Sequence, residues 1–392
     1  MNFHPIFVPI YTTVKGRNLR VTQPKFQSIL VSFILLTAGV WGHDLTVTGM
    51  NPAAKTTTGV TSGKPSLSPN RYGENVKDDD LSISETAMQA FRLRLDGQAA
   101  DARTLLENGL LKNQKDRGCL YEAARTYFYL LQFDSAESKI NQLLVCDSKN
   151  PENFELAALF AIYRSMDQMH KPPGWPSVPF TFRKSIRLYE ALLKMDPTND
   201  AMRVLLVKSY HRLPWIFGGS DRKARRHVSM LENKNPFYAT EAEVEMMPDT
   251  DVKNRINAWS NLILKNPTTA TAYDGLGKEY LRANETELAL RVFSQAEHLD
   301  STHTDHLMSL ALYFLETGDV KKGRKYIDQY INHDPPLPTP LKAHGLMIKS
   351  RIERLAGNST GASELIDAAR EVDPNFWPTS APPPEILFRP LD

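Results

Sequence analysis

The chain has 392 residues, of which 41% are apolar, so it can bury the core of one long domain or of two ordinary ones. Its 47 basic and 45 acidic side chains leave a net charge of +2, which excludes nucleic acid and anionic lipid as default partners. Its two cysteines are too few to form a zinc cluster by themselves.

The N-terminus, residues 1–42, has the composition of an export signal. Basic residues precede an uncharged, mainly apolar run over residues 26–42, and Val40 and Gly42 fit the small residues before a cleavage site. The run is also close to the lower limit of about 17 residues for a membrane-spanning helix. We therefore expect either a cleaved signal peptide or a retained membrane anchor. The protein would then be exported across the cytoplasmic membrane, to the periplasm, the envelope or the medium.

Residues 43–82 are rich in serine, threonine, glycine and proline. Their few apolar side chains cannot offset the conformational entropy that is lost on ordering, so this segment is predicted to be a disordered linker. Such a linker would let the following domain search for its partner near the membrane.

From residue 83 onward the pattern is helical and repeats about every 34 residues. Small side chains at Gly277 and Ala289 would let two antiparallel helices approach closely, and the rings of Tyr280 and Phe293 would fill the space towards the next pair. The best copy begins at Ala270 and carries these residues in a fixed spacing: Tyr273, Leu276, Gly277, Tyr280, Ala289, Phe293 and Ala296. This copy closely resembles the tetratricopeptide repeat.

Further copies begin near residues 117 and 304, and second-helix halves that close with Asp-Pro or Asn-Pro recur elsewhere. Proline disfavours helix in the residue before it, so these dipeptides mark helix ends. The resemblance implies an all-α fold, a right-handed solenoid of about eight antiparallel helix hairpins over residues 83–375. The remaining residues, 376–392, contain too many prolines for a helix, and we expect them to lie extended along the last hairpin.

The resemblance also implies a binding groove on the concave face, which is lined by the first helix of each hairpin. The groove residues that it indicates come from two of the copies: Tyr121, Arg125, Phe128, Asp274 and Lys278. The first three share one helix face and form either a ligand platform or a packing contact with the neighbouring hairpin. The lysine and asparagine set that clamps a C-terminal carboxylate in some family members is not reproduced.

The stretch "LPWIFGGS" (residues 213–220) lengthens the turn inside one hairpin by about five residues. Its glycines permit left-handed backbone, and we expect Trp215 and Phe217 to fold back onto the adjacent hairpin. The start of the next helix is either an anion site or only a helix cap, formed by Gly219, Ser220 and Arg222.

Cys119 and Cys146 stand near the start of the first helix and the end of the second helix of one hairpin. These two ends lie side by side in an antiparallel pair, and an exported chain would meet an oxidising compartment. The two cysteines are therefore expected either to form a disulfide or to lie apart as small buried apolar residues.

The motifs do not indicate an enzyme. "GNSTG" (residues 357–361) matches a hydrolase pattern, but it is expected between two helices rather than at a strand–helix elbow. We therefore expect a non-enzymatic scaffold, with neither metal nor cofactor, that binds a peptide or protein partner on its concave face in the cell envelope. We expect no nucleic acid partner, and membrane contact only through the N-terminal segment. The alternative is an exported helical-repeat component of a solute-uptake system, which a closed apolar pocket between hairpins would favour.

Overall fold

The computed structural model describes residues 12–14, 17–19, 84–170, 177–232, 234–300, 304–334, 336–377 and 383–391. Strand β1 (Thr12–Val14) pairs antiparallel with β2 (Arg17–Leu19). The predicted signal or anchor run, residues 26–42, and the predicted linker lie outside the described residues. Within the described ranges, no helix is both long and apolar enough to cross a membrane.

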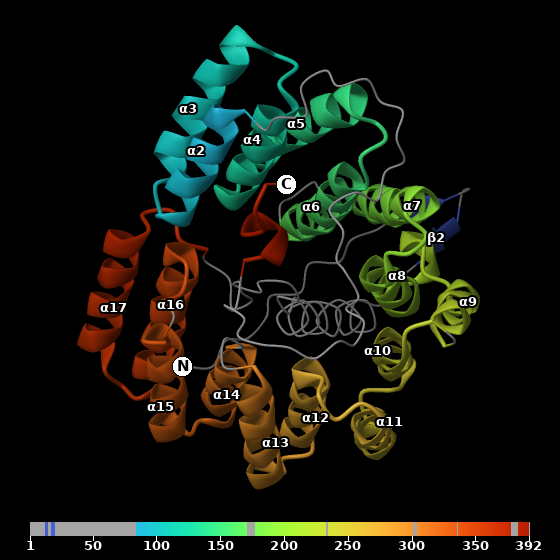
Figure 1. Cartoon of the computed structure of the whole chain (residues 1–392), viewed down its shortest axis with the longest axis vertical. Helices are drawn as coiled ribbons and strands as arrows, with labels where there is room; N and C mark the ends of the chain where they lie inside the picture. The colour runs from blue at the N-terminus through green and yellow to red at the C-terminus, as the bar shows by residue number, and fades with distance from the viewer. Residues whose placement is uncertain are drawn as a thin grey trace, which may run out of the picture.

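Sixteen α-helices form eight consecutive antiparallel hairpins in the described part of the chain, which confirms the predicted all-α solenoid (Figure 1). The helices are α2 (Glu85–Leu95), α3 (Ala99–Lys112), α4 (Arg117–Tyr129), α5 (Phe133–Cys146), α6 (Pro151–His170), α7 (Val178–Met195), α8 (Asp200–Arg212), α9 (Asp221–Leu231), α10 (Pro236–Met246), α11 (Val252–Lys265), α12 (Ala270–Arg282), α13 (Thr286–Leu299), α14 (Asp305–Thr317), α15 (Val320–Ile331), α16 (Thr339–Leu355) and α17 (Ser359–Val372). Two short 3-10 helices, η1 (Trp215–Phe217) and η2 (Glu385–Leu387), complete the set.

Several helices begin at a side-chain cap, and several end at a C-cap residue that precedes a proline. The Asp116 carboxylate accepts a hydrogen bond from the Cys119 amide at 2.7 Å and so satisfies a free donor at the start of α4. Asp196, Asn266 and Asp373 are the C-caps of α7, α11 and α17, and each precedes a proline. The dipeptides that mark helix ends in the sequence therefore mark them in the structure.

Close packing within a hairpin depends on the small residues of the repeat. A Cβ atom added to Gly277 in α12 would lie 2.6 Å from Phe293 Cδ1 in α13. The ring of Phe293 is buried against this glycine, and Ala289 is fully buried one helical turn before it. The sequence pattern thus predicts the geometry of this hairpin correctly.

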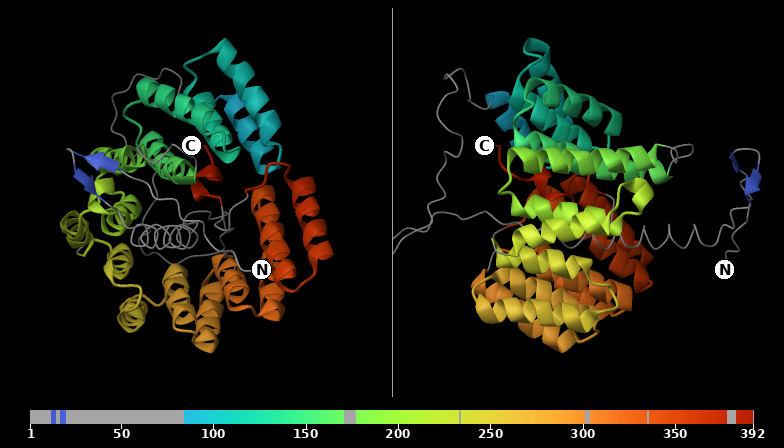
Figure 2. Two further views of the ribbon diagram at one scale, coloured as in Figure 1. Left: turned by 180° about the vertical axis from the view of Figure 1, so that it is seen from behind. Right: turned by 90° about the vertical axis from the view of Figure 1, so that its right-hand side faces the viewer.

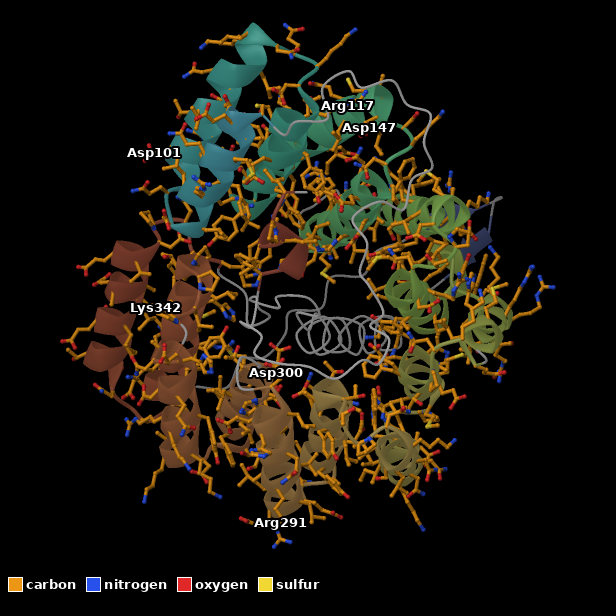
Figure 3. The ribbon with its side chains drawn as sticks, in the orientation of Figure 1. Asp101, Arg117, Asp147, Arg291, Asp300 and Lys342 are labelled. Atoms are coloured by element: carbon orange, nitrogen blue, oxygen red, sulfur yellow. The ribbon has the colours of Figure 1, made fainter. Side chains whose placement is uncertain are left out.

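The eight hairpins curve until the last one meets the first (Figures 1 and 2). A Cβ atom added to Gly97, which follows α2, would lie 2.6 Å from the carbonyl oxygen of Val372 at the end of α17. First helices such as α4, α8 and α12 line the inside of this ring, and second helices such as α3 and α13 lie outside. The side chains of Asp101 and Arg291, on α3 and α13, point away from the ring (Figure 3).

The C-terminal tail does not lie along the last hairpin, so that expectation is wrong. Residues 383–391, here called the tail, lie inside the ring against α2, α4 and α6 (Figure 1). Ile386, Leu387 and Phe388 are buried there. The closing of the ring brings the apolar inner surface of the first hairpins within reach of the tail, and burying these three side chains there is favourable.

Candidate functional site

A buried charge cluster lies on the inner surface of the first hairpins. Arg94 of α2 and Glu122 of α4 form an ion pair of 2.7 Å, and Arg125 approaches the same carboxylate at 3.4 Å. All three side chains are fully buried. Two guanidinium groups share one carboxylate, so the cluster carries an excess positive charge that needs further acceptors.

The tail supplies these acceptors from its main chain. Arg94 Nη1 donates a hydrogen bond to the Leu387 carbonyl oxygen, and Arg125 Nη2 donates one to the Arg389 carbonyl oxygen at 2.6 Å. The two carbonyls are two residues apart along the tail, and the two arginines come from neighbouring helices. Because every residue has a carbonyl oxygen, these contacts recognise a peptide backbone rather than a particular side chain.

A further contact involves a charged side chain of the tail, that of Arg389. Both terminal nitrogens of Arg389 donate to the Glu155 carboxylate of α6, each at 3.0 Å. This two-point geometry matches the planar guanidinium to the planar carboxylate, and lysine cannot reproduce it. Glu155 therefore holds the one arginine side chain of the tail by a two-point contact.

The cluster holds more donors than the tail uses. Arg94 Nη2 and Arg125 Nε are buried and have no hydrogen-bond partner among the residues that the structure describes. Burial also lowers the pKa of the Arg125 guanidinium, against the effect of Glu122. A buried donor without an acceptor is destabilising, so the site is incompletely satisfied when the tail fills it.

An aromatic cluster beside the charges closes the ring. Trp377 is 0% exposed and lies with its ring centroid 6.2 Å from Tyr129, 6.0 Å from Phe128 and 5.7 Å from Tyr163. The Tyr129 hydroxyl donates to the buried carboxylate of Asp373, the C-cap of α17. These contacts join the last hairpin to α4 and α6, and Trp377 shares its apolar cluster with Ile386, Leu387 and Phe388 of the tail.

The predicted groove residues of α4 belong to this site. Arg125 lies 5.3 Å from the Tyr121 ring centroid and 5.1 Å from that of Phe91, and Phe128 packs on Trp377. Both alternatives for this helix face therefore have a counterpart in the structure: the arginine holds a peptide segment, and the aromatic rings form packing contacts. The segment that is held comes from the same chain.

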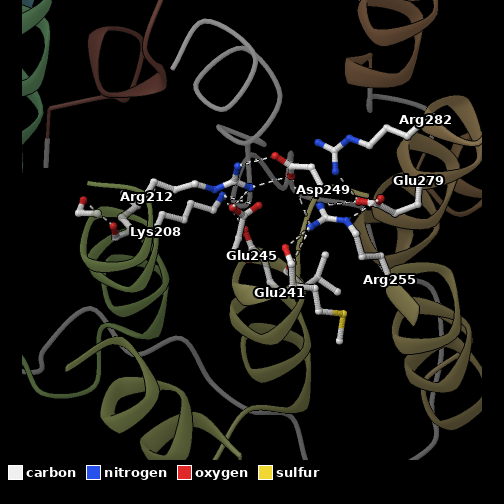
Figure 4. A network of polar contacts seen from close by, with 12 residues as sticks. Lys208, Arg212, Glu241, Glu245, Asp249, Arg255, Glu279 and Arg282 are labelled. Atoms are coloured by element: carbon white, nitrogen blue, oxygen red, sulfur yellow. Dashed lines mark hydrogen bonds and ion pairs between the residues drawn. The ribbon is translucent and has the colours of Figure 1, made fainter. Parts of the chain in front are cut away.

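The other two predicted groove residues pair with each other. Lys278 Nζ lies 2.7 Å from Asp274 Oδ2 along α12. They stand near a second ion-pair network that links α8, α10, α11 and α12 and that the sequence pattern did not indicate (Figure 4). Its members are Lys208, Arg212, Glu241, Glu245, Asp249, Arg255, Glu279 and Arg282.

Arg255 is the centre of that network. Its guanidinium makes two hydrogen bonds to Glu279, of 2.8 and 2.9 Å, and a third to the Val244 carbonyl oxygen. Burial acts against the charged form of Asp249, but the hydrogen bond from Arg212 and the nearby guanidinium groups lower the pKa of Asp249 below its usual value. The network therefore fixes successive hairpins relative to each other.

The long loop between α8 and α9 is a structural turn. The Gly219 amide donates to the Pro214 carbonyl oxygen at 3.1 Å, and the Ser220 amide donates to the Tyr210 carbonyl oxygen at 2.7 Å. Ser220 Oγ caps α9 by accepting from the Lys223 amide. The Gly219 and Ser220 amides are therefore not available to an anion, and the arrangement corresponds to a helix cap. Arg222 is exposed beside it.

The two aromatic residues of this loop differ. Phe217 packs edge-on against Phe182 of α7 with ring centroids 5.6 Å apart, as expected. Trp215 is 78% exposed, so the expectation that it folds back onto the adjacent hairpin is wrong. The single 3-10 turn, η1, directs the two side chains to different sides.

Cys119 and Cys146 are free thiols, so the disulfide alternative is not realised. Cys119 Sγ lies 3.2 Å from the Ser84 hydroxyl, which caps α2. Its side chain is therefore directed at the preceding hairpin, and Cys119 is one of the buried apolar residues of the core.

A closed ring of eight helix hairpins with a peptide segment on its inner surface defines a helical-repeat protein. Residues 275–338 match the sequence model of the tetratricopeptide repeat. Residues 275–338 therefore carry tetratricopeptide repeats, as the spacing of Gly277 and Phe293 predicted. Stacked repeats of this kind serve as scaffolds for protein–protein interaction.

Several solved structures are similar to this chain. The MamA protein has 17% sequence identity and a TM-score of 0.27, over 55% of this chain and 91% of that chain. The C-terminal part of a TPR repeat-containing protein from Cytophaga hutchinsonii has 14% identity and a TM-score of 0.34, over 64% and 95%. PilW, a type IV pilus biogenesis factor, has 14% identity and a TM-score of 0.30, over 65% and 92%. No curated protein sequence matches the chain.

Proposed function

We propose that the protein is a non-enzymatic scaffold of the cell envelope, which binds a peptide segment of a protein partner on the inner surface of its helical ring. One observation carries this proposal. Arg94 and Arg125 hold main-chain carbonyls of a peptide segment, and Glu155 holds its arginine side chain. This surface thus has the chemistry of peptide recognition.

The envelope location is supported by the sequence alone. The basic and then apolar composition of the first 42 residues is typical of export, and the following polar residues suit a linker. A scaffold on such a linker would meet partners that share its membrane.

Affinity capture with competitive release tests the proposal. The tagged full-length protein is captured from the envelope fraction of its native cells, and bound proteins are released with an excess of a synthetic peptide of residues 384–391. We expect at least one protein to be released by this peptide and not by a scrambled one. If both peptides release the same proteins, the inner surface is not the binding surface.

A hollow between α14 and α16 favours small-ligand binding as a second candidate. It has a volume of about 460 Å³ and is lined by Leu312, Leu315, Glu316, Arg351, Arg354 and Leu355. Apolar walls with two arginines suit a small amphipathic anion. Calorimetric titration with a medium-chain fatty acid tests this candidate, and the same heat from an Arg354→Glu variant would contradict it.

A further inference from the structure

We propose that the tail is a displaceable internal competitor, and that its site binds in trans a partner segment of three apolar residues followed by arginine. This inference rests on the proposed function and deepens it by naming the chemistry of the segment. It also assigns the tail a role, since a partner must displace residues 383–391 before it can bind.

The chemistry of the partner follows from what the site holds. Ile386, Leu387 and Phe388 are buried, so the site accepts three consecutive apolar side chains. The next residue is Arg389, whose guanidinium meets the Glu155 carboxylate at two points. An acidic residue at that position would face Glu155 with a like charge and would be rejected.

The tail is suited to displacement because it leaves buried donors unpaired. Arg94 Nη2 and Arg125 Nε find no acceptor in the described ranges when the tail is bound. A partner with a further carbonyl or carboxylate in reach of these nitrogens would bind better than the tail. The tail has a compensating advantage, since its covalent linkage gives it an effective concentration of about millimolar order.

Release of the tail does not require the ring to open. Trp377 packs on Phe128 and Tyr129 of α4, and the Tyr129 hydroxyl donates to Asp373. Trp377 also belongs to the apolar cluster that includes Ile386, Leu387 and Phe388 of the tail. The contacts of Trp377 and Asp373 with α4 are made by groups outside the tail and remain available to hold the ring closed when the tail leaves.

The test uses the full-length chain and a fluorescently labelled peptide of residues 384–391. Fluorescence anisotropy gives the dissociation constant for the wild type and for an Arg389→Glu variant, in which the tail is repelled by Glu155. We expect the variant to bind the peptide at least about tenfold more tightly, because breaking a charge pair of this kind releases the competitor. A matched control is Arg370→Glu, the same change at an exposed arginine of α17, which should bind like the wild type.

A charge exchange tests the arginine preference. A peptide with glutamate in place of its arginine should not bind the Arg389→Glu chain, and it should bind a chain that carries Glu155→Arg. If circular dichroism shows that the Glu155→Arg chain does not fold, the affinities of the two peptides for the Arg389→Glu chain still test the arginine preference. Equal affinity of the two peptides there would overturn the preference.

Three further results would overturn the inference in distinguishable ways. Equal affinity of the wild type and Arg389→Glu for the labelled peptide means that the tail is no competitor, although the site still binds peptides and the proposed function stands. Absence of binding to both chains contradicts the proposed function as well. If sedimentation shows that the wild type is a dimer and that Arg389→Glu is a monomer, the site is occupied by the tail of a second copy instead.

Discussion

Trp377→Ala should destabilise the protein strongly, because this side chain is the centre of the ring closure. Trp377 is 0% exposed and contacts Phe128, Tyr129 and Tyr163 with ring centroids 5.7 to 6.2 Å away. Removal of a fully buried tryptophan costs about 3–5 kcal/mol, and aromatic pairs of this geometry account for about 0.5–1.5 kcal/mol each beyond their buried area. We therefore expect a loss of about 4 kcal/mol in the free energy of unfolding.

Urea unfolding followed by circular dichroism at 222 nm measures this loss. Because stacked repeats couple mainly to their neighbours, loss of the contact between the two ends of the ring should also reduce the cooperativity of unfolding. The matched control is Trp215→Ala, since Trp215 is 78% exposed. Its change should stay within about 0.5 kcal/mol. Similar losses for the two variants, or a loss below about 1 kcal/mol for Trp377→Ala, would refute the ring closure through Trp377.

Three further predictions concern packing, pH and thiols. Gly277→Ala should lower the free energy of unfolding by about 1–3 kcal/mol, because the new methyl group would clash with the Phe293 ring. In the control, Gly323→Ala, the new methyl group would lie 3.4 Å from Ile352, and thermal unfolding should show a neutral or stabilising effect. Burial raises the pKa of the Asp373 carboxyl above its ordinary 3.8. The stability that the protonated carboxyl contributes is therefore complete below pH 3.8, and it is lost as the pH rises through the folded-state pKa. Asp373→Asn should therefore reduce the loss of stability between pH 4 and 7, and an unchanged loss would contradict this. Burial raises the pKa of the Cys119 thiol to about 11, so a thiol reagent without reductant should react with Cys146 alone in the native protein and with both cysteines in urea. Fewer than two reactive thiols in urea would contradict the free thiols.

The repeat could be predicted from the sequence because its signals are local. The spacing of Gly277, Ala289 and Phe293 encodes one hairpin, and a proline after Asp196 or Asn266 encodes one helix end. Each signal acts over at most a few helical turns, so it does not depend on contacts with distant parts of the chain. This is why the number of hairpins and their boundaries follow from the pattern.

The ring closure could not be predicted, because it depends on a small rotation accumulated over eight hairpins. Arg125 was predicted to line the groove, but nothing near it in the sequence indicates that it contacts the main chain of residues 383–391. Glu155 and Arg389, which form the selective contact, lie on segments with no local pattern that pairs them. The two tryptophans show the same limit, since Trp215 and Trp377 both lie in proline-containing loops and only one is buried.

The structure of the Arg389→Glu chain bound to the peptide of residues 384–391 would show directly whether the inner surface of the ring recognises a peptide. We expect the peptide to lie between α2, α4 and α6, with its carbonyls on Arg94 and Arg125 and its arginine on Glu155. A peptide bound elsewhere on the ring, or a site still filled by the tail of the variant, would contradict peptide recognition by this surface.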